Sequence, residues 1–179
     1  MILTELDRVA AYRMHLPKWA ATPISGEGAK KLGGRANRPG VAALYLSLNV
    51  ETAVKEYRRT STLFSPGTLV SYQATLRPVV DFRKGFDSSW DPIWEDFYCD
   101  WRELWFNGRI EPPSWVVGDE VIASGAKGIL FQSHMDSKGT NLLVYTDTLC
   151  DTDFLSAFDP QQALPRNQDS WQNPRGKND

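Results

Sequence analysis

A glycine-rich stretch at residues 26–40, which reads GEGAKKLGGRANRPG, constrains the fold of this chain more than any other feature. Its five glycines allow positive φ and close backbone approach, so the stretch predicts a loop with unusual backbone demands. The apolar run that follows, residues 41–47, is typical of a buried strand. Asn49 can then cap a helix over residues 50–57, where apolar side chains repeat on one face. A glycine loop, a strand and a helix are therefore expected in succession.

The sequence after this point changes its period several times. Residues 69–76 alternate as a strand does, with one drier face. Asp91-Pro92 resembles a helix start, and aromatic residues then follow at spacings of three or four until Asn107-Gly108. A shorter helix and two strands are expected at residues 115–123, 128–132 and 141–145. Strands and helices mix without a regular βαβ rhythm, which favours the α+β class.

Length and charge narrow the classes of protein further. The 179 residues suit one domain, because cores usually hold together up to about 250 residues. Apolar residues become scattered late in the chain, so we expect a domain over residues 1–159 and a polar C-terminal tail over residues 160–179. The 20 Lys+Arg and 22 Asp+Glu give a net charge of −2. This balance argues against a general nucleic-acid binder but leaves a local basic cleft open.

Cysteine usage and apolar patterning indicate the environment of the protein. Cys99 and Cys150 do not form a CxxC pair, and with only His15 and His134 beside them we expect no metal site. The first residues lack the basic start, apolar core and cleavage site of a secretion signal. No apolar run approaches the ~20 residues needed to span a bilayer. We therefore expect a cytoplasmic protein with reduced thiols and no membrane contact.

Four residues could carry chemistry, and each also has a plain structural interpretation. Arg35, in the glycine loop, could hold a phosphate bidentately, or it is a solvated surface arginine. Tyr45 could stack on a planar ligand, or it is a core tyrosine whose neighbours Leu44 and Leu46 point the other way. The chain has no GxSxG elbow, P-loop, HExxH or kinase signature that would decide between these interpretations.

Glu56 and Ser133 have similar alternatives. Glu56 could place a carboxylate at the rim of a pocket, or it is a solvated side chain paired with Arg59 or Thr60. Ser133 follows a predicted strand, where ligand groups are common, or it is an ordinary turn serine in the polar connection that also contains Asp136. The tryptophans recur at helical spacing without interleaved basic residues, so we expect core packing rather than nucleobase stacking.

The order of these residues resembles the RES domain family, which is named for Arg, Glu and Ser. Residues 21–57 match its opening text through the positions Ser25-Gly26-Glu27-Gly28, Gly33-Gly34-Arg35, Tyr45, Ser47 and Glu56. The later segments GILFQS and NLLVY are similar to the family's second part, which assigns the named serine to Ser133 and puts Asn141 nearby. The resemblance covers about residues 10–146. At Ala36 the sequence departs from the tryptophan that usually follows the motif arginine.

This resemblance implies a fold, a substrate and a partner. RES proteins resemble ADP-ribosyltransferases, so we expect a mixed β-sheet core with flanking helices, and NAD as the substrate with no metal. The family resembles toxins of bacterial toxin–antitoxin pairs, which either degrade NAD with water or phosphate or pass ADP-ribose to a protein such as phosphoribosyl pyrophosphate synthetase. The partner implied is an antitoxin of the Xre type with a helix-turn-helix DNA-binding part, and the toxin itself binds no nucleic acid.

Chemistry and resemblance together predict the role of each residue. The nicotinamide of NAD leaves as a neutral base, so one carboxylate can suffice, and we assign it to Glu56. The catalytic set adds an arginine for the pyrophosphate, a tyrosine near nicotinamide and a serine at its ribose: Arg35, Tyr45 and Ser133. Ser47, Asn141, Arg13 and His15 are expected to bind NAD as well.

The acceptor of the ADP-ribose is left between two alternatives. Ala36, smaller than the usual tryptophan, could widen the mouth of the site and admit a protein acceptor, or remove a packing contact and reduce activity. Transfer to a protein is favoured slightly, on the first of these alternatives and because the aromatic residues 90–115 could present an acceptor surface. Hydrolysis or phosphorolysis of NAD is the close alternative. Two other classes are a non-catalytic nucleotide-binding module and a structural interaction protein built around the tryptophan helix.

Overall fold

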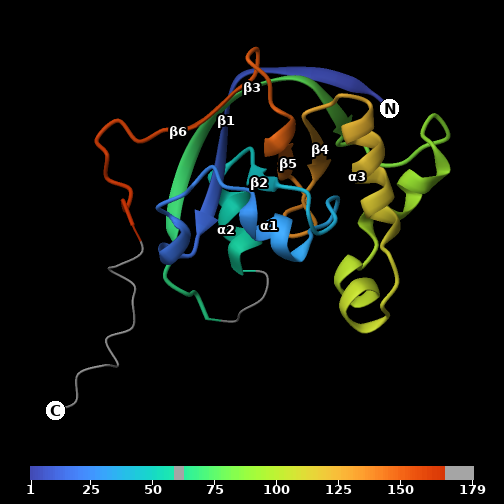
Figure 1. Ribbon diagram of the computed structural model, residues 1–179, viewed down its shortest axis with the longest axis horizontal. Helices are drawn as coiled ribbons and strands as arrows, with labels where there is room; N and C mark the ends of the chain where they lie inside the picture. Colours follow the sequence, from blue (N-terminus) through green and yellow to red (C-terminus); the bar gives the residue numbers. More distant parts are fainter. Residues whose placement is uncertain (59–62, 168–179) are drawn as a thin grey trace.

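Two long strands organise the sheet of this computed structural model, which describes residues 1–58 and 63–167 (Figure 1). β1 (Leu3–His15) and β3 (Thr68–Phe82) pair antiparallel, with Leu3 opposite Val80 and His15 opposite Thr68. The register shifts on both sides of Leu6, and such bulges bend a strand and increase its twist. The two strands therefore curve together along much of the molecule.

The remaining elements complete a mixed sheet. In chain order they are η1 (Pro17–Trp19), α1 (Glu27–Leu32), β2 (Ala43–Ser47), α2 (Val50–Arg58), η2 (Pro92–Tyr98), η3 (Glu103–Asn107), α3 (Pro113–Ala123), β4 (Gly128–Gln132), β5 (Thr140–Tyr145), η4 (Thr146–Thr148) and β6 (Phe154–Ala157). The strand order is β1-β2-β5-β4-β3-β6, and because β1 also pairs with β3 the first five strands close on themselves. Among the strand pairs of residues 1–58 and 63–167, only β3–β4 is parallel.

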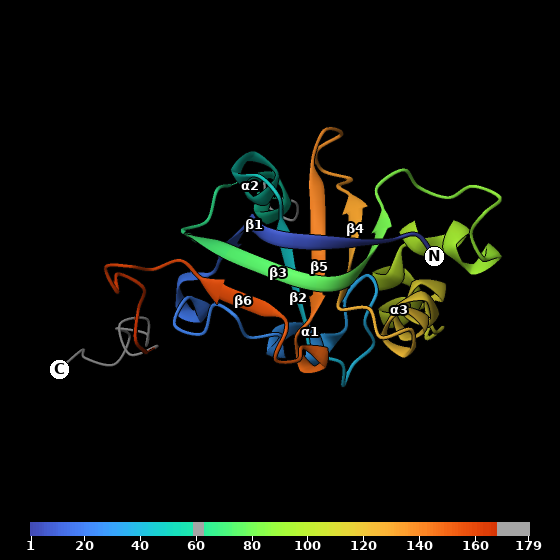
Figure 2. The same cartoon turned by 90° about the horizontal axis from the view of Figure 1, so that it is seen from above.

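Figure 2 shows how the strands cross. β1 and β3 run across β2, β5 and β4, while α2 lies on one side and α1 on the other. The helical segments between β3 and β4 gather at one end of the molecule, away from β6. The prediction of a single α+β domain with a mixed sheet and flanking helices is confirmed.

Apolar side chains form two clusters on opposite faces of β2. Leu44 and Leu46 pack in one cluster with residues of β1, β3 and β5, while Tyr45 packs against the other. The alternation expected for this strand is therefore confirmed. The second cluster includes Trp90 and Trp94 of the aromatic segment, residues 90–115. Trp101 and Trp115 of this segment are buried as well, whereas Trp105 is half-buried. Core packing of the tryptophans is thus confirmed for these four.

Most predicted elements occur close to their predicted positions. α2 begins after Asn49, whose side chain accepts a hydrogen bond from the Thr52 amide at 2.7 Å, so the cap is confirmed. Its buried residues are Thr52 and Ala53, whereas Val50 is exposed. β3 extends six residues beyond its predicted end, because Val79, Val80 and Phe82 continue the pairing with β1 and β4.

Some predictions of local structure were wrong. The helix expected from Asp91 to Asn107 is two short ones, η2 and a π-helical turn η3, because Cys99 adopts an extended conformation between them. The glycine loop contains the helix α1, and strands β1 and β6 were not predicted. In the expected tail, Leu164 packs against a core cluster. Residues 168–179 lie outside the described residues.

Candidate active site

The carboxylate of Glu56, which is half-buried, is the centre of a group of polar side chains. Its Oε1 atom accepts two hydrogen bonds of 2.7 Å, one from the Ser133 hydroxyl and one from Nδ2 of Asn141. Ser133 and Asn141 are both buried. Within residues 1–58 and 63–167 the other oxygen, Oε2, accepts no hydrogen bond. The carboxylate is thus oriented through one oxygen, which leaves the second available for chemistry.

Three strand ends and a helix bring these side chains together. Glu56 lies on α2, Ser133 follows β4, and Asn141 is paired with Ser47 at the end of β2. The Ser47 hydroxyl donates to Oδ1 of Asn141 at 2.8 Å, which orients the amide so that Nδ2 faces Glu56. We call Ser47, Glu56, Ser133 and Asn141 the Glu56 cluster. Ser47 acts within it by positioning Asn141.

The turn after β4 fixes the proton of Ser133. Its hydroxyl oxygen accepts from the backbone amides of Met135 at 3.1 Å and Asp136 at 3.2 Å. A hydroxyl has one proton to donate, so these two bonds leave that proton for Glu56. Ser133 is therefore a turn serine, and its hydroxyl also donates to the Glu56 carboxylate; its contact with a ligand stays a prediction.

Asp136 joins the same turn to α2. Its carboxylate accepts from the buried Thr52 hydroxyl at 2.7 Å and forms an ion pair with Lys55 at 3.1 Å. The hydrogen bond from Thr52, followed by that from Lys55, lowers the pKa of Asp136 below its ordinary value. Gly139 allows this contact, because a Cβ there would collide with the Thr52 side chain. We call the contacts of Asp136 with Thr52 and Lys55 the Asp136 clamp. It holds the turn that contains Ser133 against the helical turn that precedes Glu56.

Arg35 occupies a separate position at the wall of a pocket. Its Nη1 atom donates to the carbonyls of Phe97 and Cys99, each at 3.3 Å, and the guanidinium lies 5.4 Å from the ring centroid of Tyr98. The glycine loop therefore carries Arg35 onto the aromatic segment rather than into solvent. A guanidinium held in this way is suited to an anionic ligand.

Tyr45 uses its hydroxyl to hold the glycine loop. It donates to Oδ1 of Asn37 at 2.8 Å and accepts from the Ala36 amide at 3.1 Å. Burial raises the pKa of Tyr45 well above its ordinary value, although the Ala36 amide and the guanidiniums of Arg35 and Arg13 act in the opposite direction. The phenol is therefore neutral, and its hydroxyl is engaged with the loop rather than directed at a ligand.

Arg13 and His15 lie on β1, apart from the hydrogen bonds of the Glu56 cluster. The Tyr72 hydroxyl donates to the Pro23 carbonyl at 2.9 Å, so Nε2 of His15 donates to Tyr72 at 2.5 Å. Burial, with a smaller contribution from Arg13, lowers the pKa of His15 to about 4. Burial also lowers the pKa of Arg13, while the phenols of Tyr72 and Tyr45 raise it. Arg13 forms no ion pair within residues 1–58 and 63–167.

Ala36, where the sequence departs from the family motif, lies in the core. Ala36 is fully buried, and its carbonyl accepts from the Tyr145 hydroxyl at 2.7 Å. A change at this position therefore acts on core packing beside Gly118 rather than on the mouth of a site. Arg59 and Thr60, the alternative partners of Glu56, lie outside the described residues.

Reasoning from the sequence did not identify Thr52, Lys55 or Tyr98 as parts of the site. Thr52 lies four residues before Glu56, which puts both on one face of the helix, and this spacing is the signal that could have indicated it.

Across residues 1–58 and 63–167, no group of three or more His, Cys, Asp or Glu side chains could hold a metal ion. Cys99 and Cys150 are both free thiols. In the same part of the chain, every helix is too short or too polar to cross a bilayer.

Comparison with known proteins identifies the family. The model of the RES domain matches residues 10–167. This chain belongs to the RES domain family. The match extends past the region of sequence resemblance and includes β6. Arg35, Glu56 and Ser133 are thus three residues of a RES domain, and two of them share a hydrogen bond.

A solved structure has the same fold. A chain in the crystal structure of the M. tuberculosis MbcT–MbcA toxin–antitoxin complex is similar over 88% of each chain, with 18% sequence identity and a TM-score of 0.55. At this identity the likeness concerns the fold. No curated protein matches the sequence.

Proposed function

We propose that this RES protein binds NAD and cleaves its nicotinamide–ribose bond, acting as the toxin of a toxin–antitoxin pair. The observation that carries the proposal is the Glu56 carboxylate, oriented through Oε1 by Ser133 and Asn141. Membership of the RES family and a fold shared with a chain of a toxin–antitoxin complex support it.

The reaction that we propose needs one carboxylate and no general acid. The bond from C1′ of the ribose to the nicotinamide nitrogen breaks, and its electron pair passes to the nitrogen, which was cationic and becomes neutral. Positive charge develops on C1′ and its ring oxygen, where a fixed carboxylate stabilises it. A nucleophile then attacks C1′ and loses a proton, for which Oε2 of Glu56 is the available acceptor.

The other side chains have supporting roles in this proposal. Ser133 and Asn141 keep the carboxylate in position, and Ser47 positions Asn141. Arg35 supplies positive charge to the diphosphate, and Arg13, which has no ion pair within the described ranges, adds to the field around Tyr45. In this proposal the ring of Tyr45 lies near nicotinamide, while its hydroxyl holds the glycine loop.

The acceptor of the ADP-ribose stays undecided in the proposal between water, phosphate and a protein side chain. Both features that favoured a protein acceptor have another place in the molecule. Ala36 is buried in the core, and so are four tryptophans of the aromatic segment, Trp90, Trp94, Trp101 and Trp115. These buried residues do not support a protein acceptor over water or phosphate, so the experiment has to separate the three outcomes.

We also propose an antitoxin partner that covers this site, of the Xre helix-turn-helix type that the family resemblance implies. The MbcT–MbcA complex is a toxin bound to an antitoxin, which supports a partner of this kind. We expect the toxin to lose NAD cleavage when it is saturated with the antitoxin. Undiminished activity of the saturated complex would reject this part of the proposal.

The experiment that tests the function uses NAD labelled in its adenine. The purified protein is incubated with it, with and without phosphate and a cell lysate, and both small molecules and proteins are resolved. We expect free nicotinamide in every case, with label in ADP-ribose for hydrolysis, in its phosphate for phosphorolysis, or in a protein band for transfer. Intact NAD throughout, from protein of verified fold, would favour a non-catalytic nucleotide-binding module.

A further inference from the structure

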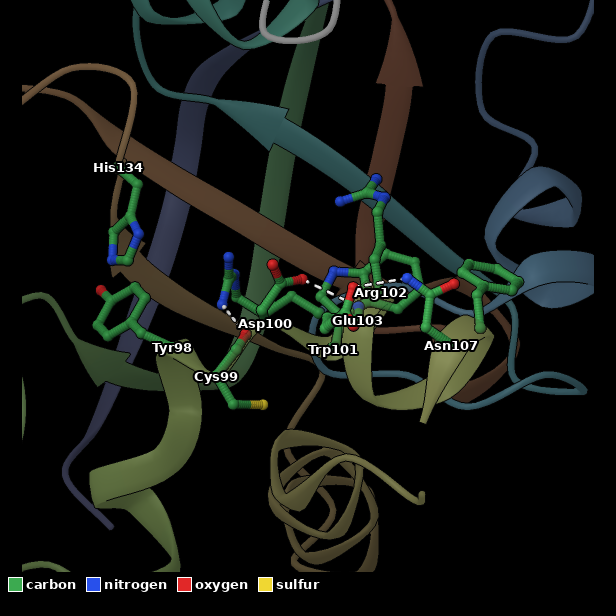
Figure 3. Close-up of a pocket in the computed structure, with 10 residues that line it drawn as sticks. Tyr98, Cys99, Asp100, Trp101, Arg102, Glu103, Asn107 and His134 are labelled. Atoms are coloured by element: carbon green, nitrogen blue, oxygen red, sulfur yellow. Dashed lines mark hydrogen bonds between the residues drawn. The ribbon is translucent and has the colours of Figure 1, made fainter. Parts of the chain in front are cut away.

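A pocket of about 570 Å³ lies where the aromatic segment meets Arg35 and His134 (Figure 3). This volume lies within the range of ~300–1,000 Å³ that is usual for small-molecule sites. Its wall includes Arg35 and residues from Tyr98 to Asn107, together with His134 from the turn after β4. The glycine loop, the aromatic segment and the end of β4 meet at this point.

The pocket reaches the turn that carries Ser133 through His134. Figure 3 shows the ring of His134 facing that of Tyr98, and the two are stacked with centroids 4.2 Å apart and an interplanar angle of 23°. His134 directly follows Ser133, and the Tyr98 hydroxyl donates to the Gln132 carbonyl at 3.2 Å. A ligand whose ribose lies at Glu56 can therefore extend past this stacked pair into the pocket.

Arg35 is the next residue that a ligand extending from Glu56 into the pocket would contact. Its guanidinium lies against the same Tyr98 ring, 5.4 Å from the centroid, and is held by two main-chain carbonyls. The anionic part of NAD is its diphosphate, which joins the two nucleosides. A fixed guanidinium matches the diphosphate in charge and in hydrogen-bond geometry.

The far wall combines aromatic rings with hydrogen-bonding groups. Phe106 is 45% exposed, and the guanidinium of Arg102 lies 4.3 Å from the ring centroid of Trp101. Nδ2 of Asn107 donates to Oε2 of Glu103 at 2.6 Å, as the dashed line between them in Figure 3 marks. Aromatic faces stack on purines, asparagine pairs with the edge of adenine, and carboxylates accept from ribose hydroxyls.

The backbone of this wall is unusual in the same place. Residues Glu103–Asn107 form a π-helical turn, in which the Gly108 amide donates to the Glu103 carbonyl at 2.9 Å. Such turns are rare and are frequently found at functional sites. The turn brings Glu103, Phe106 and Asn107 to one pocket. In a regular α-helix these three side chains would point in other directions.

We propose that this pocket binds the adenosine half of NAD and so makes residues 101–107 the element that recognises the nucleotide. The inference rests on the proposed function, because the position of Glu56 fixes where the other half of the substrate lies. Nicotinamide ribose at Glu56, diphosphate at Arg35 and adenosine at Phe106 and Asn107 then follow the order of the groups in NAD.

The experiment measures the binding of ADP, which carries only the adenosine and phosphate groups, by calorimetry. Two single variants, Phe106→Ala and Asn107→Ala, are compared with Phe154→Ala, in which a phenylalanine of similar exposure, 49%, is removed from β6 at the other end of the molecule. We expect ADP to bind the unaltered protein and Phe154→Ala equally. Its affinity should fall about tenfold in each pocket variant, while that of nicotinamide mononucleotide changes less than twofold.

Two results would overturn the inference: ADP that does not bind, or ADP that binds both pocket variants as tightly as the unaltered protein. The failure of the proposed function looks different. ADP that binds and depends on Phe106 and Asn107, in a protein that leaves NAD intact, would support the adenosine pocket and reject the cleavage reaction. Thermal unfolding of each variant verifies that the fold is retained.

Discussion

The Glu56 cluster and the aromatic segment are both conspicuous in the structure, and they are built in opposite ways. The cluster joins four polar side chains from distant parts of the sequence through hydrogen bonds of 2.7 and 2.8 Å. The aromatic segment is local in sequence and apolar, with three rings packed on Phe82 at centroid distances of 4.8 to 5.0 Å. The aromatic residues of this segment support the fold, whereas the proposed chemistry depends on a few scattered polar groups.

The two regions meet at Tyr98. Its ring packs on Phe97 within the aromatic segment, and its hydroxyl donates to the carbonyl that precedes Ser133. Packing in the aromatic segment therefore supports the turn that carries the serine. Substitutions in the segment should affect stability first, and substitutions in the cluster should affect turnover first. This contrast can be tested residue by residue.

The largest effect on stability is expected for Trp94→Ala. Trp94 is fully buried and stacks on Phe97, and its removal leaves a large cavity, so unfolding free energy should fall by about 3–5 kcal/mol. Denaturant unfolding measures it. Trp19→Ala is the matched control, because Trp19 is 49% exposed and should change stability by less than about 0.5 kcal/mol. Equal losses of unfolding free energy in Trp94→Ala and Trp19→Ala would contradict a structural role for the aromatic segment.

Ser133→Ala should act on turnover instead. Glu56 keeps one of its two donors, and kcat for NAD is expected to fall about 10²-fold with little change in the unfolding midpoint. Ser137→Ala, an exposed serine of the same turn, should keep full activity. If Ser133→Ala lowers stability but not kcat, Ser133 belongs with the aromatic segment as a structural residue.

His15 should affect the pH dependence of stability. Its pKa in the folded protein, about 4, lies below its ordinary value of 6.5, so the unfolded chain takes up the proton first as pH falls. The contribution is complete above pH 6.5 and is lost as pH falls towards 4. Between pH 7 and pH 5 the protein should lose about 2 kcal/mol through this group.

The variant that isolates this contribution is His15→Gln, which keeps a donor for Tyr72 but does not titrate. Denaturant unfolding at several pH values should give a flatter profile between pH 7 and pH 5 than the unaltered protein has. Identical profiles would mean that His15 is not the titrating group.

The smallest effect is expected for Asp136→Asn. The amide keeps an acceptor for Thr52 but loses the ion pair with Lys55, so the Ser133 turn is held less firmly against α2. We expect kcat to fall about tenfold while KM stays the same, because the loss concerns positioning rather than binding. Asp151→Asn, at an exposed aspartate, is the control. A change in KM alone would place Asp136 in substrate binding.

The sequence predicted the central part of the site because its residues stand at the ends of short, regular elements. Glu56 lies on α2, Ser133 directly follows β4 and Asn141 lies on β5. The patterns of these elements are clear, and the family motif joined the three residues. The direction of the Tyr45 hydroxyl could not be predicted, since it depends on a loop that folds back onto β2. The Asp136 clamp depends in the same way on a contact between residues 84 positions apart.

The parts of the fold that were missed have related causes. β1 is stabilised by pairing with β3 across more than fifty residues, and Arg8 with φ of 48° interrupts any simple alternation. In the aromatic segment the spacing of apolar residues is helical, yet the extended Cys99 ends η2. In this segment periodicity correctly indicated that Trp90, Trp94, Phe97 and Trp101 are buried. It does not indicate where a short helix stops.

The most direct test of the central claim is nicotinamide release from NAD by the unaltered protein and by Glu56→Gln. Glutamine keeps an oxygen that can accept from Ser133 and Asn141 and removes only the charge, so the unfolding midpoint should not change. We expect steady nicotinamide release from the unaltered protein and a rate about 10²–10³-fold lower from the variant. Equal rates from the two folded proteins would contradict the role of Glu56.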